Sequence, residues 1–277
     1  MILNANGPGI GDAIILSAVA YHYHKTYPNE PITIVSNYPE LFKNNPDISK
    51  AVGNWNHPEF IQLHSPWNLK RHVVQFILQQ YNIIPPKWED IRQYIYIEPI
   101  VLLTTPYITF QVKASNWTKN KDWSTNFWEE LVLKVRDKLN IEMVQVGGLQ
   151  DPIIKYGRND WLKLNSLSIT TSLIKGANLH ICIDSGTMHI ASGTGTKSIV
   201  IWGGRGDPFV IGYANNINIQ VDPHRLINHT RQKNCSPCWK IEDCPYGWYS
   251  NDEFYKPCMQ LISVDRVFEE VKKCLSF

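Results

Sequence analysis

The sequence lacks three features that would assign it to large classes of protein. Its 277 residues contain no apolar run of roughly 20 residues, the length that a helix needs to span a bilayer. No positively charged stretch precedes the first apolar residues, as a secretory signal would require. An excess of one charge is also missing, because 27 Lys and Arg residues accompany 25 Asp and Glu residues. We therefore expect a cytoplasmic protein whose main partner is not nucleic acid.

A dinucleotide-binding fingerprint is absent as well. The chain opens with an apolar strand, Met1 to Ala5, followed by glycines at positions 7, 9 and 11. The fingerprint needs glycines at its first, third and sixth places, but the sixth place here is Asp12, and no acidic ribose partner is evident downstream. This pattern argues against a nicotinamide cofactor. The glycines instead allow a close approach of the backbone to a ligand, and Asp12 would project from the first helical turn, where an acid can serve as a base.

The segment from residue 179 to 204 carries the strongest functional signal. It predicts a short apolar strand, a turn at Asp184, Ser185 and Gly186, a short helix that contains Thr187 and His189, and a second strand. A strand that leads into a helix N-terminus favours anion binding, because unpaired N–H groups and the helix dipole both attract negative charge. The pattern indicates a site for a nucleotide diphosphate.

Alternating strands and helices predict an α/β fold with parallel sheets. A content of 43% hydrophobic residues in 277 can fill two modest cores, and Thr104-Thr-Pro106 is typical of a linker. We place the domain boundary there, with an N-terminal domain at 1–103 and a C-terminal domain at 104–277. The expected helices are 13–26, 67–81, 124–139 and 169–175, and the expected strands are 1–5, 32–36, 94–97, 107–112, 141–147, 179–183 and a strand after the helix that contains His189.

Several candidate residues have a structural alternative. An Asp at the start of a helix, such as Asp12, commonly caps the helix dipole, and Asp184 either caps a helix or binds a sugar hydroxyl. His189 is either a buried, satisfied histidine or a donor to a phosphate or sugar oxygen. Gly148, after Gly147 at the end of a strand, would allow close approach of a nucleoside, with Gln150 near the ribose.

The four cysteines within residues 235–258 supply an independent signal. Cys235 and Cys238 form a Cys-x2-Cys knuckle, whereas Cys244 and Cys258 are separated by 13 residues. Four thiolates suggest a structural tetrahedral metal, although the second pair lacks knuckle spacing. The alternatives are a reduced cysteine cluster and, in an oxidising compartment, disulfides.

The order of three motifs resembles glycosyltransferase family 9, the ADP-heptose:lipopolysaccharide heptosyltransferases and their relatives. The motifs are Gly11-Asp12 after the first strand, Lys121-Asp-Trp123 ahead of Trp128, and Asp184-Ser-Gly-Thr-Met-His189. The resemblance extends from Met1 to a helix ending near Leu275, and includes Tyr27-Pro28 and Asn45-Pro46-Asp47.

The resemblance implies two Rossmann-like domains facing a cleft (GT-B type), here with a shortened N-terminal half. The acceptor binds to the N-terminal half and the nucleotide sugar to the C-terminal half, and inverting transfer proceeds without a catalytic metal. Asp12 is the expected base, and Lys121 offsets the charge of the leaving diphosphate, since no D-x-D pair is present to hold a cation. The alternative for Lys121 is a solvated lysine beside Lys113 and Lys119.

The resemblance further implies which other residues form the site. The expected substrate-binding residues are Gly9, Gly11, Lys121, Gly148, Asp184, Ser185, Gly186, Thr187 and His189. Relatives that glycosylate autotransporter proteins have comparable cysteines, which implies iron at Cys235, Cys238, Cys244 and Cys258, while zinc is chemically equally suitable.

We therefore expect an inverting glycosyltransferase that transfers a sugar from a nucleotide-diphospho-sugar to a hydroxyl of a saccharide or protein. The expected sugar is heptose, and the expected donor is ADP-heptose. Contact with a membrane-bound acceptor would be peripheral, at the inner membrane face. One alternative is a non-catalytic sugar-nucleotide-binding or scaffold protein. A second is a metal-knuckle nucleic-acid-binding module with a basic surface of Arg225, Arg231, Lys233 and Lys240.

Overall fold

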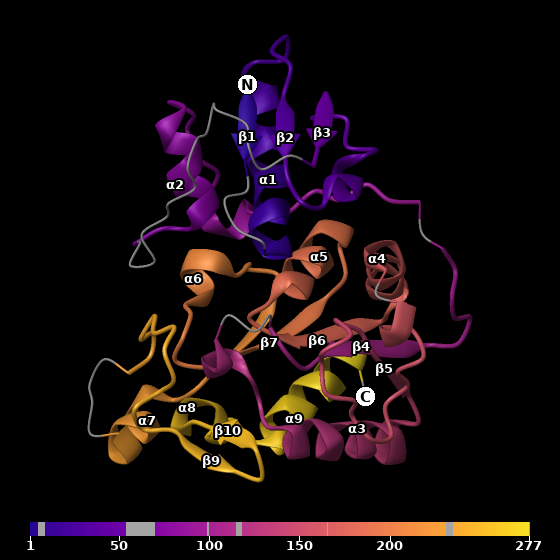
Figure 1. The fold of residues 1–277 in the computed structure, drawn as a ribbon, viewed down its shortest axis with the longest axis vertical. Coiled ribbons are helices and arrows are strands. Elements are labelled where there is room, and N and C mark those ends of the chain that lie inside the picture. Colours follow the sequence, from indigo (N-terminus) through magenta and orange to yellow (C-terminus); the bar gives the residue numbers. More distant parts are fainter. Residues whose placement is uncertain are drawn as a thin grey trace.

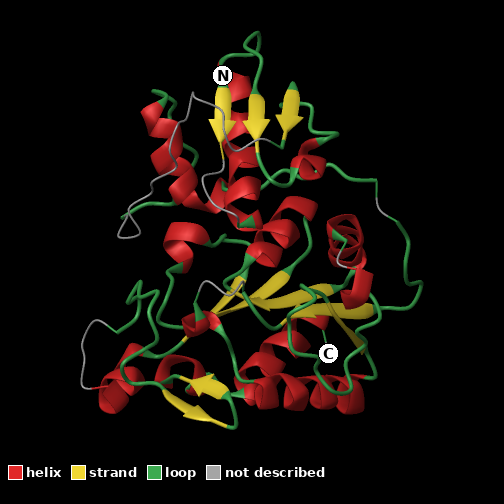
Figure 2. Ribbon diagram, in the orientation of Figure 1, coloured by secondary structure: helices red, strands yellow, loops and turns green. Residues whose placement is uncertain are grey.

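The fold has two parallel sheets, one in each half of the chain (Figure 1). A computed structural model describes residues 1–4, 9–53, 70–98, 100–114, 118–164, 166–230 and 235–276. The three-stranded sheet lies at the top of Figure 1, and the five-stranded sheet crosses its middle. Figure 2 shows helices on both sides of the larger sheet. The α/β class predicted from the alternation of strands and helices is confirmed.

The smaller sheet has the order β1-β2-β3, with all neighbours parallel. Its strands are only three residues long, and Leu3, Ile34 and Val35 on them are buried. The bounds of the described elements before residue 104 are β1 Ile2–Asn4, α1 Ile10–Thr26, β2 Thr33–Val35, η1 Pro39–Phe42, β3 Lys50–Val52, α2 Val73–Gln80 and η2 Trp88–Asp90.

The larger sheet has the order β5-β4-β6-β7-β8 and is also parallel throughout. This is a doubly wound order, in which the first and third strands in sequence, β4 and β6, lie side by side at the centre. Ligands of such sheets bind at the carboxyl ends of these two strands, where the connections leave in opposite directions. The order therefore predicts the location of the site before any side chain is considered.

The bounds after residue 104 are β4 Tyr107–Gln111, η3 Lys119–Lys121, α3 Thr125–Leu139, β5 Glu142–Gln145, η4 Leu162–Leu164, α4 Leu167–Gly176, β6 Leu179–Ile183, α5 Gly186–Thr194, β7 Ser198–Trp202, α6 Pro208–Ile211, β8 Ile217–Gln220, α7 Pro223–Thr230, β9 Trp248–Ser250, β10 Glu253–Tyr255, α8 Pro257–Gln260 and α9 Val264–Leu275. The short strands β9 and β10 form an antiparallel pair within the cysteine-rich segment, residues 235–258.

Alternate residues of the larger sheet pack into two different cores, because successive side chains of a strand point to opposite faces. Ile181 and Ile199 belong to the core shared with α3 and α9, whereas Cys182 and Val200 face the core shared with α4 and α5. The second of these cores continues through α5 into α1 and the smaller sheet. One apolar core therefore crosses the boundary between the two halves, so this boundary is not a solvated cleft along its whole length.

Helix α1 lies at the junction of the halves. Its residues 13–20 are all buried, so the helix is covered on every side, and it packs against both α2 and α5. The segment before β4 also enters this junction, because Ile95 donates its backbone N–H to the Gly193 carbonyl of α5 at 3.2 Å. The Gln93 N–H likewise donates to the Ser192 hydroxyl at 3.3 Å.

Two expected elements differ from the structure. Residues 94–97 were predicted to be a strand, but they form no strand, because their backbone N–H groups bond to helices: that of Tyr94 donates to Ser17 of α1, and that of Ile95 donates to Gly193 of α5. The helix predicted at 67–81 begins at Val73 within the described residues, since His72 caps it by accepting a hydrogen bond from the Val74 N–H at 3.2 Å. Lys70 and Arg71 precede that helix and are exposed.

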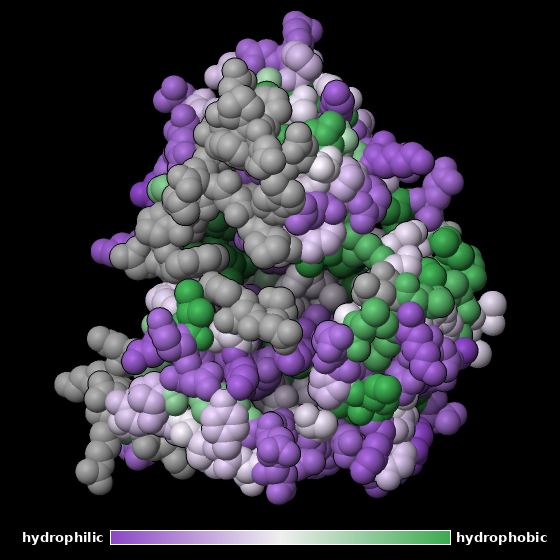
Figure 3. All heavy atoms as spheres, viewed as in Figure 1, coloured by the Kyte–Doolittle hydropathy of each residue, from purple (hydrophilic) through white to green (hydrophobic). Residues whose placement is uncertain are grey.

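The chain between Ile95, which contacts α5, and the start of β4 at Tyr107 is partly exposed. Ile100 and Val101 are 51% and 78% exposed, and Leu164 of η4 is 57% exposed. Figure 3 shows apolar surface on the right-hand side of this view, over α4 and the chain that connects the halves. No helix among the described residues combines the length and the apolar character needed to cross a membrane.

The contact between residues 93–95 and α5 gives a prediction about stability. A Cβ on Gly193 would lie 2.7 Å from Cγ1 of Ile95, so the change Gly193→Ala overpacks the junction despite the better helix propensity of alanine. We expect the free energy of unfolding to fall by about 1–3 kcal/mol in urea titrations. Gly53→Ala is the matched control, since its Cβ would meet nothing closer than 3.8 Å. Equal stability of the two variants would contradict this packing.

Candidate functional site

Asp12 lies in the first turn of α1, where that helix approaches the larger sheet. Its carboxylate folds back toward the N-cap, since a Cβ on Gly9 would be 2.9 Å from Asp12 Oδ2. Burial raises the pKa of Asp12 above its usual value of 3.8, the carboxylate of Asp184 raises it further, and Lys121 opposes both effects. The three groups are thus close enough to influence one another, and Asp12 is a better base than an exposed aspartate.

Lys121 and Asp184 form an ion pair, with Nζ and Oδ2 2.8 Å apart. Lys121 is the last residue of η3, and Asp184 directly follows β6. Their side chains are only 12% and 7% exposed, so the pair is shielded from solvent. An ammonium group has three hydrogens, which allows one lysine to bind a carboxylate and a phosphate oxygen together. Lys121 is therefore paired with Asp184 and lies near enough to Asp12 to lower the pKa of that carboxyl group.

The N-terminus of α5 starts at Gly186, directly after the N-cap residue Ser185. The hydroxyls of Ser185 and Thr187 both donate to Oε1 of Gln111 at the end of β4, the latter at 3.0 Å. The Thr187 hydroxyl also contacts Nε2 of His180 at 2.9 Å. These side chains thus join the ends of β4 and β6. The Met188 N–H bonds to the Ser185 carbonyl at 3.2 Å, which leaves the backbone N–H groups of Gly186 and Thr187 to face a ligand.

His189 is buried where α5 meets α1. Its Nδ1 shares a hydrogen bond with the Tyr213 hydroxyl, and burial lowers the pKa of His189 to about 4, so the ring is neutral at pH 7. A Cβ on Gly11 would lie 2.8 Å from Cδ2 and 3.0 Å from Nε2 of this ring. The absence of a side chain at Gly11 therefore allows the two helix ends to meet, and His189 can act as a neutral hydrogen-bonding group only.

A further acid lies beside Gly148, at the end of β5. Asp151 accepts a hydrogen bond from the Gly148 N–H at 3.2 Å, and burial raises the pKa of Asp151 to about 6. Gly147 has a φ of +150°, which is accessible to glycine and rarely to other residues. The sequence pattern singled out the glycines and Gln150 here, and missed Asp151 because a single acid in a loop carries no signal of its own.

The predicted residues thus fall into one main group and one outlying position. Asp12, Lys121, Asp184 and His189 influence one another electrostatically, and Gly9, Gly11 and Gly186 lie at the two helix ends beside them. Gly148 lies at the end of a neighbouring strand. No motif or spacing in the sequence indicates Gln111, His180 or Tyr213. A base, a cation and free helix N–H groups at the switch point of a parallel sheet are together suited to a reaction on a phosphorylated substrate.

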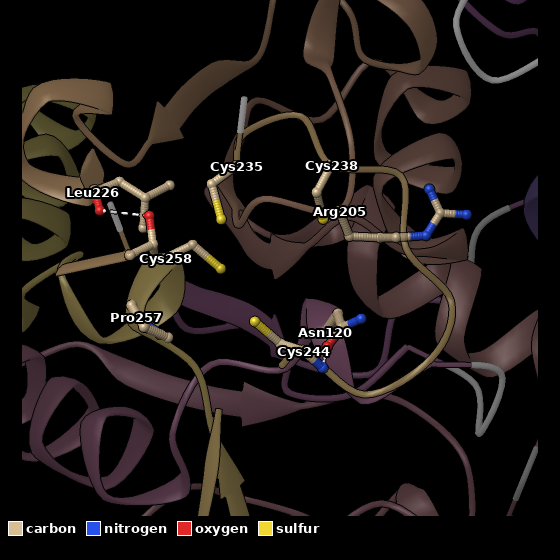
Figure 4. Close-up of a pocket in the computed structure, with 9 residues that line it drawn as sticks. Asn120, Arg205, Leu226, Cys235, Cys238, Cys244, Pro257 and Cys258 are labelled. Atoms are coloured by element: carbon tan, nitrogen blue, oxygen red, sulfur yellow. Dashed lines mark hydrogen bonds between the residues drawn. The ribbon is translucent and has the colours of Figure 1, made fainter. Parts of the chain in front are cut away.

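The four cysteines of residues 235–258 line one small cavity of about 20 Å³ (Figure 4). This volume is enough for one ion or one water molecule. All four have free thiols, and burial raises the pKa of Cys258 to about 11. In the described part of the chain, however, no three His, Cys, Asp or Glu side chains are arranged closely enough to hold a metal ion. The cysteines are gathered at one place without forming a finished coordination shell.

Only part of the alternative basic surface lies among the described residues. Arg225 on α7 and Lys240 are exposed, whereas Arg231 and Lys233 lie outside the described residues.

The raised pKa of Asp12 gives a prediction about stability. A carboxyl group whose pKa is higher in the folded than in the unfolded state lowers the free energy of unfolding as the pH rises above the unfolded-state pKa. This loss of stability is complete above the folded-state pKa. We therefore expect Asp12→Asn to be more stable than the wild type at pH 8, with the difference shrinking as the pH falls toward 4. Chemical denaturation at several pH values measures this. Glu130→Gln on the exposed face of α3 is the control, and a pH-independent difference for Asp12→Asn would contradict the prediction.

Comparison with known proteins finds one family. The model described as glycosyltransferase family 9 (heptosyltransferase) matches residues 161–240. This range includes the Asp184 to His189 motif and the Cys235 and Cys238 pair. No curated protein matches the sequence. The resemblance inferred from the order of the motifs is thus confirmed over this part of the chain.

Solved structures extend the similarity to the whole fold. A glycosyl transferase family 9 from Veillonella parvula DSM 2008 has a TM-score of 0.68 at 16% identity, covering 99% of this chain and 96% of that one. The iron-containing dodecameric glycosyltransferase TibC from enterotoxigenic E. coli H10407 has a TM-score of 0.70 at 14% identity, covering 99% and 76%. TibC has also been solved in complex with ADP-D-beta-D-heptose.

A third similar structure is the E. coli ADP-heptose lps heptosyltransferase II, with a TM-score of 0.62 at 15% identity, covering 99% of this chain and 98% of that one. Identities this low show a common fold and not a common substrate. Residues 161–240 thus match the family 9 model, and the whole chain has the fold of family 9 glycosyltransferases of known structure.

Proposed function

We propose that the protein transfers a sugar from an ADP-sugar, specifically ADP-heptose, to a hydroxyl group of a saccharide or protein acceptor, with inversion at the anomeric carbon. The observation that carries the proposal is the meeting of Asp12, Lys121 and the N-terminus of α5 at the switch point of the larger sheet. The complex of TibC with ADP-D-beta-D-heptose supports the choice of donor.

In the proposed reaction, the diphosphate binds across the first turn of α5 and beside Lys121. The acceptor hydroxyl attacks the anomeric carbon while Asp12 takes its proton, and the bond from that carbon to the diphosphate oxygen breaks with its electron pair. Lys121 and the helix N–H groups stabilise the negative charge that develops on the departing ADP. The raised pKa of Asp12 brings its basicity closer to that needed for proton transfer at neutral pH.

The position of the nucleoside follows from the ends of the neighbouring strands. Gly148 leaves room for a ligand at the end of β5, whereas the space beside Gly147 is taken by the Asp151 carboxylate, which can accept hydrogen bonds from ribose hydroxyls. The sugar would then extend from the diphosphate toward Asp12 on α1. The acceptor would then bind on the side of the N-terminal half, as the resemblance implies.

The donor and base roles predict opposite effects of two substitutions. Lys121→Ala removes a charged hydrogen-bond donor, so calorimetry should give at least about tenfold weaker binding of ADP. Asp12→Asn should keep or improve ADP affinity, because it removes a negative charge near the diphosphate. It should slow ADP release from ADP-heptose by roughly 10²–10⁴-fold, with water or an added acceptor as nucleophile. In the wild type, this activity should fall at acidic pH as Asp12 becomes protonated.

Lys163→Ala on the surface of η4 is the control for loss of a positive charge. Failure of the wild type to bind ADP or any ADP-sugar would refute the proposed donor. If Asp12→Asn releases ADP from ADP-heptose at the wild-type rate, Asp12 is not the base. The proposed donor site would be unaffected by that result.

We also propose that Cys235, Cys238, Cys244 and Cys258 hold one structural metal ion, zinc or iron. The support is the donor set itself, four thiols around a cavity of the size of one ion, and the iron content stated for TibC. A metal bound there would cross-link the segment from 235 to 258, and it would take no part in the transfer.

Metal analysis of the purified protein should find about one zinc or iron ion per chain. Replacing Cys235 and Cys238 by serine should abolish the metal and lower the thermal unfolding midpoint. Cys274→Ser is the control, because this cysteine lies on α9, away from the cavity. A protein that folds fully and carries no metal when purified with zinc or iron present would contradict this role.

A further inference from the structure

The short helix η3 connects the cysteine-rich segment with the proposed donor site. Its three residues are Lys119, Asn120 and Lys121, and the first two contact the cysteine-rich segment while the third pairs with Asp184. In a 3₁₀-helix, consecutive side chains point about 120° apart. Neighbouring residues of η3 can therefore serve two different sites.

Asn120 is the buried member of this group, at 3% exposure, and it lines the same cavity as the four cysteines (Figure 4). Its Nδ2 donates to the carbonyl oxygens of Lys240 at 3.1 Å and Glu242 at 2.7 Å. Its Oδ1 accepts from the Cys244 N–H at 3.1 Å. Both hydrogens of the amide are thus used, and the three bonds reach residues more than 100 positions away in the sequence.

The contact made by Lys119 is of a different kind. Its Nζ donates to the Tyr249 hydroxyl at 2.8 Å, which in turn donates to Asp243 at 2.7 Å. These groups are exposed, and exposed polar pairs contribute little to stability. The buried amide of Asn120 is therefore the main attachment of η3 to the cysteine-rich segment.

The loop after β7 fills the space between the two sites. A Cβ on Gly203 would lie 3.3 Å from the Asn120 carbonyl oxygen, and one on Gly206 would lie 2.8 Å from Asp184 Oδ2. On the other side, Gly204 accepts a hydrogen bond from the Cys238 N–H. If η3 moved, it would collide with this loop. The position of Lys121 therefore depends on where the cysteine-rich segment holds η3.

We propose that Asn120 is a positioning residue for donor binding, because its side-chain amide fixes η3 on the cysteine-rich segment and thereby places the Lys121 ammonium beside the donor diphosphate. This inference rests on the proposed function, which assigns the diphosphate to Lys121. It means that the folded state of residues 235–258 controls donor affinity without touching the donor.

The test uses Asn120→Asp in the full chain. The substitution keeps an acceptor for the Cys244 N–H but loses both donated bonds and sets a carboxylate oxygen against two carbonyl oxygens. Calorimetry should give roughly tenfold weaker ADP binding, the loss expected when buried hydrogen bonds fail. Adenosine, which lacks the diphosphate, should bind equally well to both proteins in ligand-observed NMR.

A double-mutant cycle decides whether the effect passes through Lys121. In the Lys121→Ala background, Asn120→Asp should cause no further loss of ADP affinity. Asn45→Asp is the matched control, because Asn45 is also buried, donates to the Tyr94 carbonyl at 3.2 Å, accepts from the Asp47 N–H and lies in the other half of the chain. It should leave ADP binding unchanged in the folded protein.

Each failure has its own meaning. A wild type that binds no ADP refutes the proposed donor. Normal ADP affinity of Asn120→Asp, an equal loss of adenosine binding, or an additive loss in the double mutant overturns the positioning role and leaves the donor assignment intact. If Asn120→Asp fails to fold, Asn120→Ala, which removes the bonds without adding a charge, is measured in the same way.

Discussion

The structure depends on the close approach of two helix N-termini, those of α1 and α5. A side chain at Gly11 would occupy the place of the His189 ring, and a Cβ on Gly186 would overlap Ile10. Only at this distance can Asp12 from the N-terminal half sense both Lys121 and Asp184 from the C-terminal half. The glycines matter here for the space they leave open, since neither has the backbone conformation that excludes other residues.

The meeting of two helix starts also explains the balance of charge at the site. Each N-terminus presents partial positive charge, and the ammonium of Lys121 adds a full one. Asp12 and Asp184 compensate this charge within the protein, while His189 adds none at pH 7 because burial keeps it neutral. Arg205 is a further buried cation, and Asp184 stabilises its charge against the effect of burial. Positive charge is therefore supplied by groups that are held in place, which suits the recognition of a diphosphate.

Local sequence signals predicted the elements that carry the site, and nonlocal contacts decided what they missed. The strand-turn-helix patterns at Asp12 and Asp184 were visible because apolar periodicity and turn residues are local properties. The extended segment at 94–97 was mistaken for a strand, since its partner is a helix carbonyl about 100 residues away. Gln111 binds the start of α5 only because β4 and β6 are adjacent, which no residue pattern states, and His180 binds Thr187 because α5 packs against the strand that precedes it.

Buried polar bonds at the junction limit the relative motion of the halves. The Ser17 hydroxyl of α1 donates to Gln93 at 3.1 Å, and the Gln93 N–H donates to Ser192 of α5, so one residue joins a helix from each half. Turning one half against the other would leave these groups buried without partners, at a cost of about 1–3 kcal/mol for each. These bonds favour one arrangement of the halves, so in the proposed reaction Asp12 and Lys121 would already lie near each other before a substrate binds. Such preorganisation lowers the barrier of a reaction between two bound molecules, because the entropy of placing the catalytic groups has already been lost in folding.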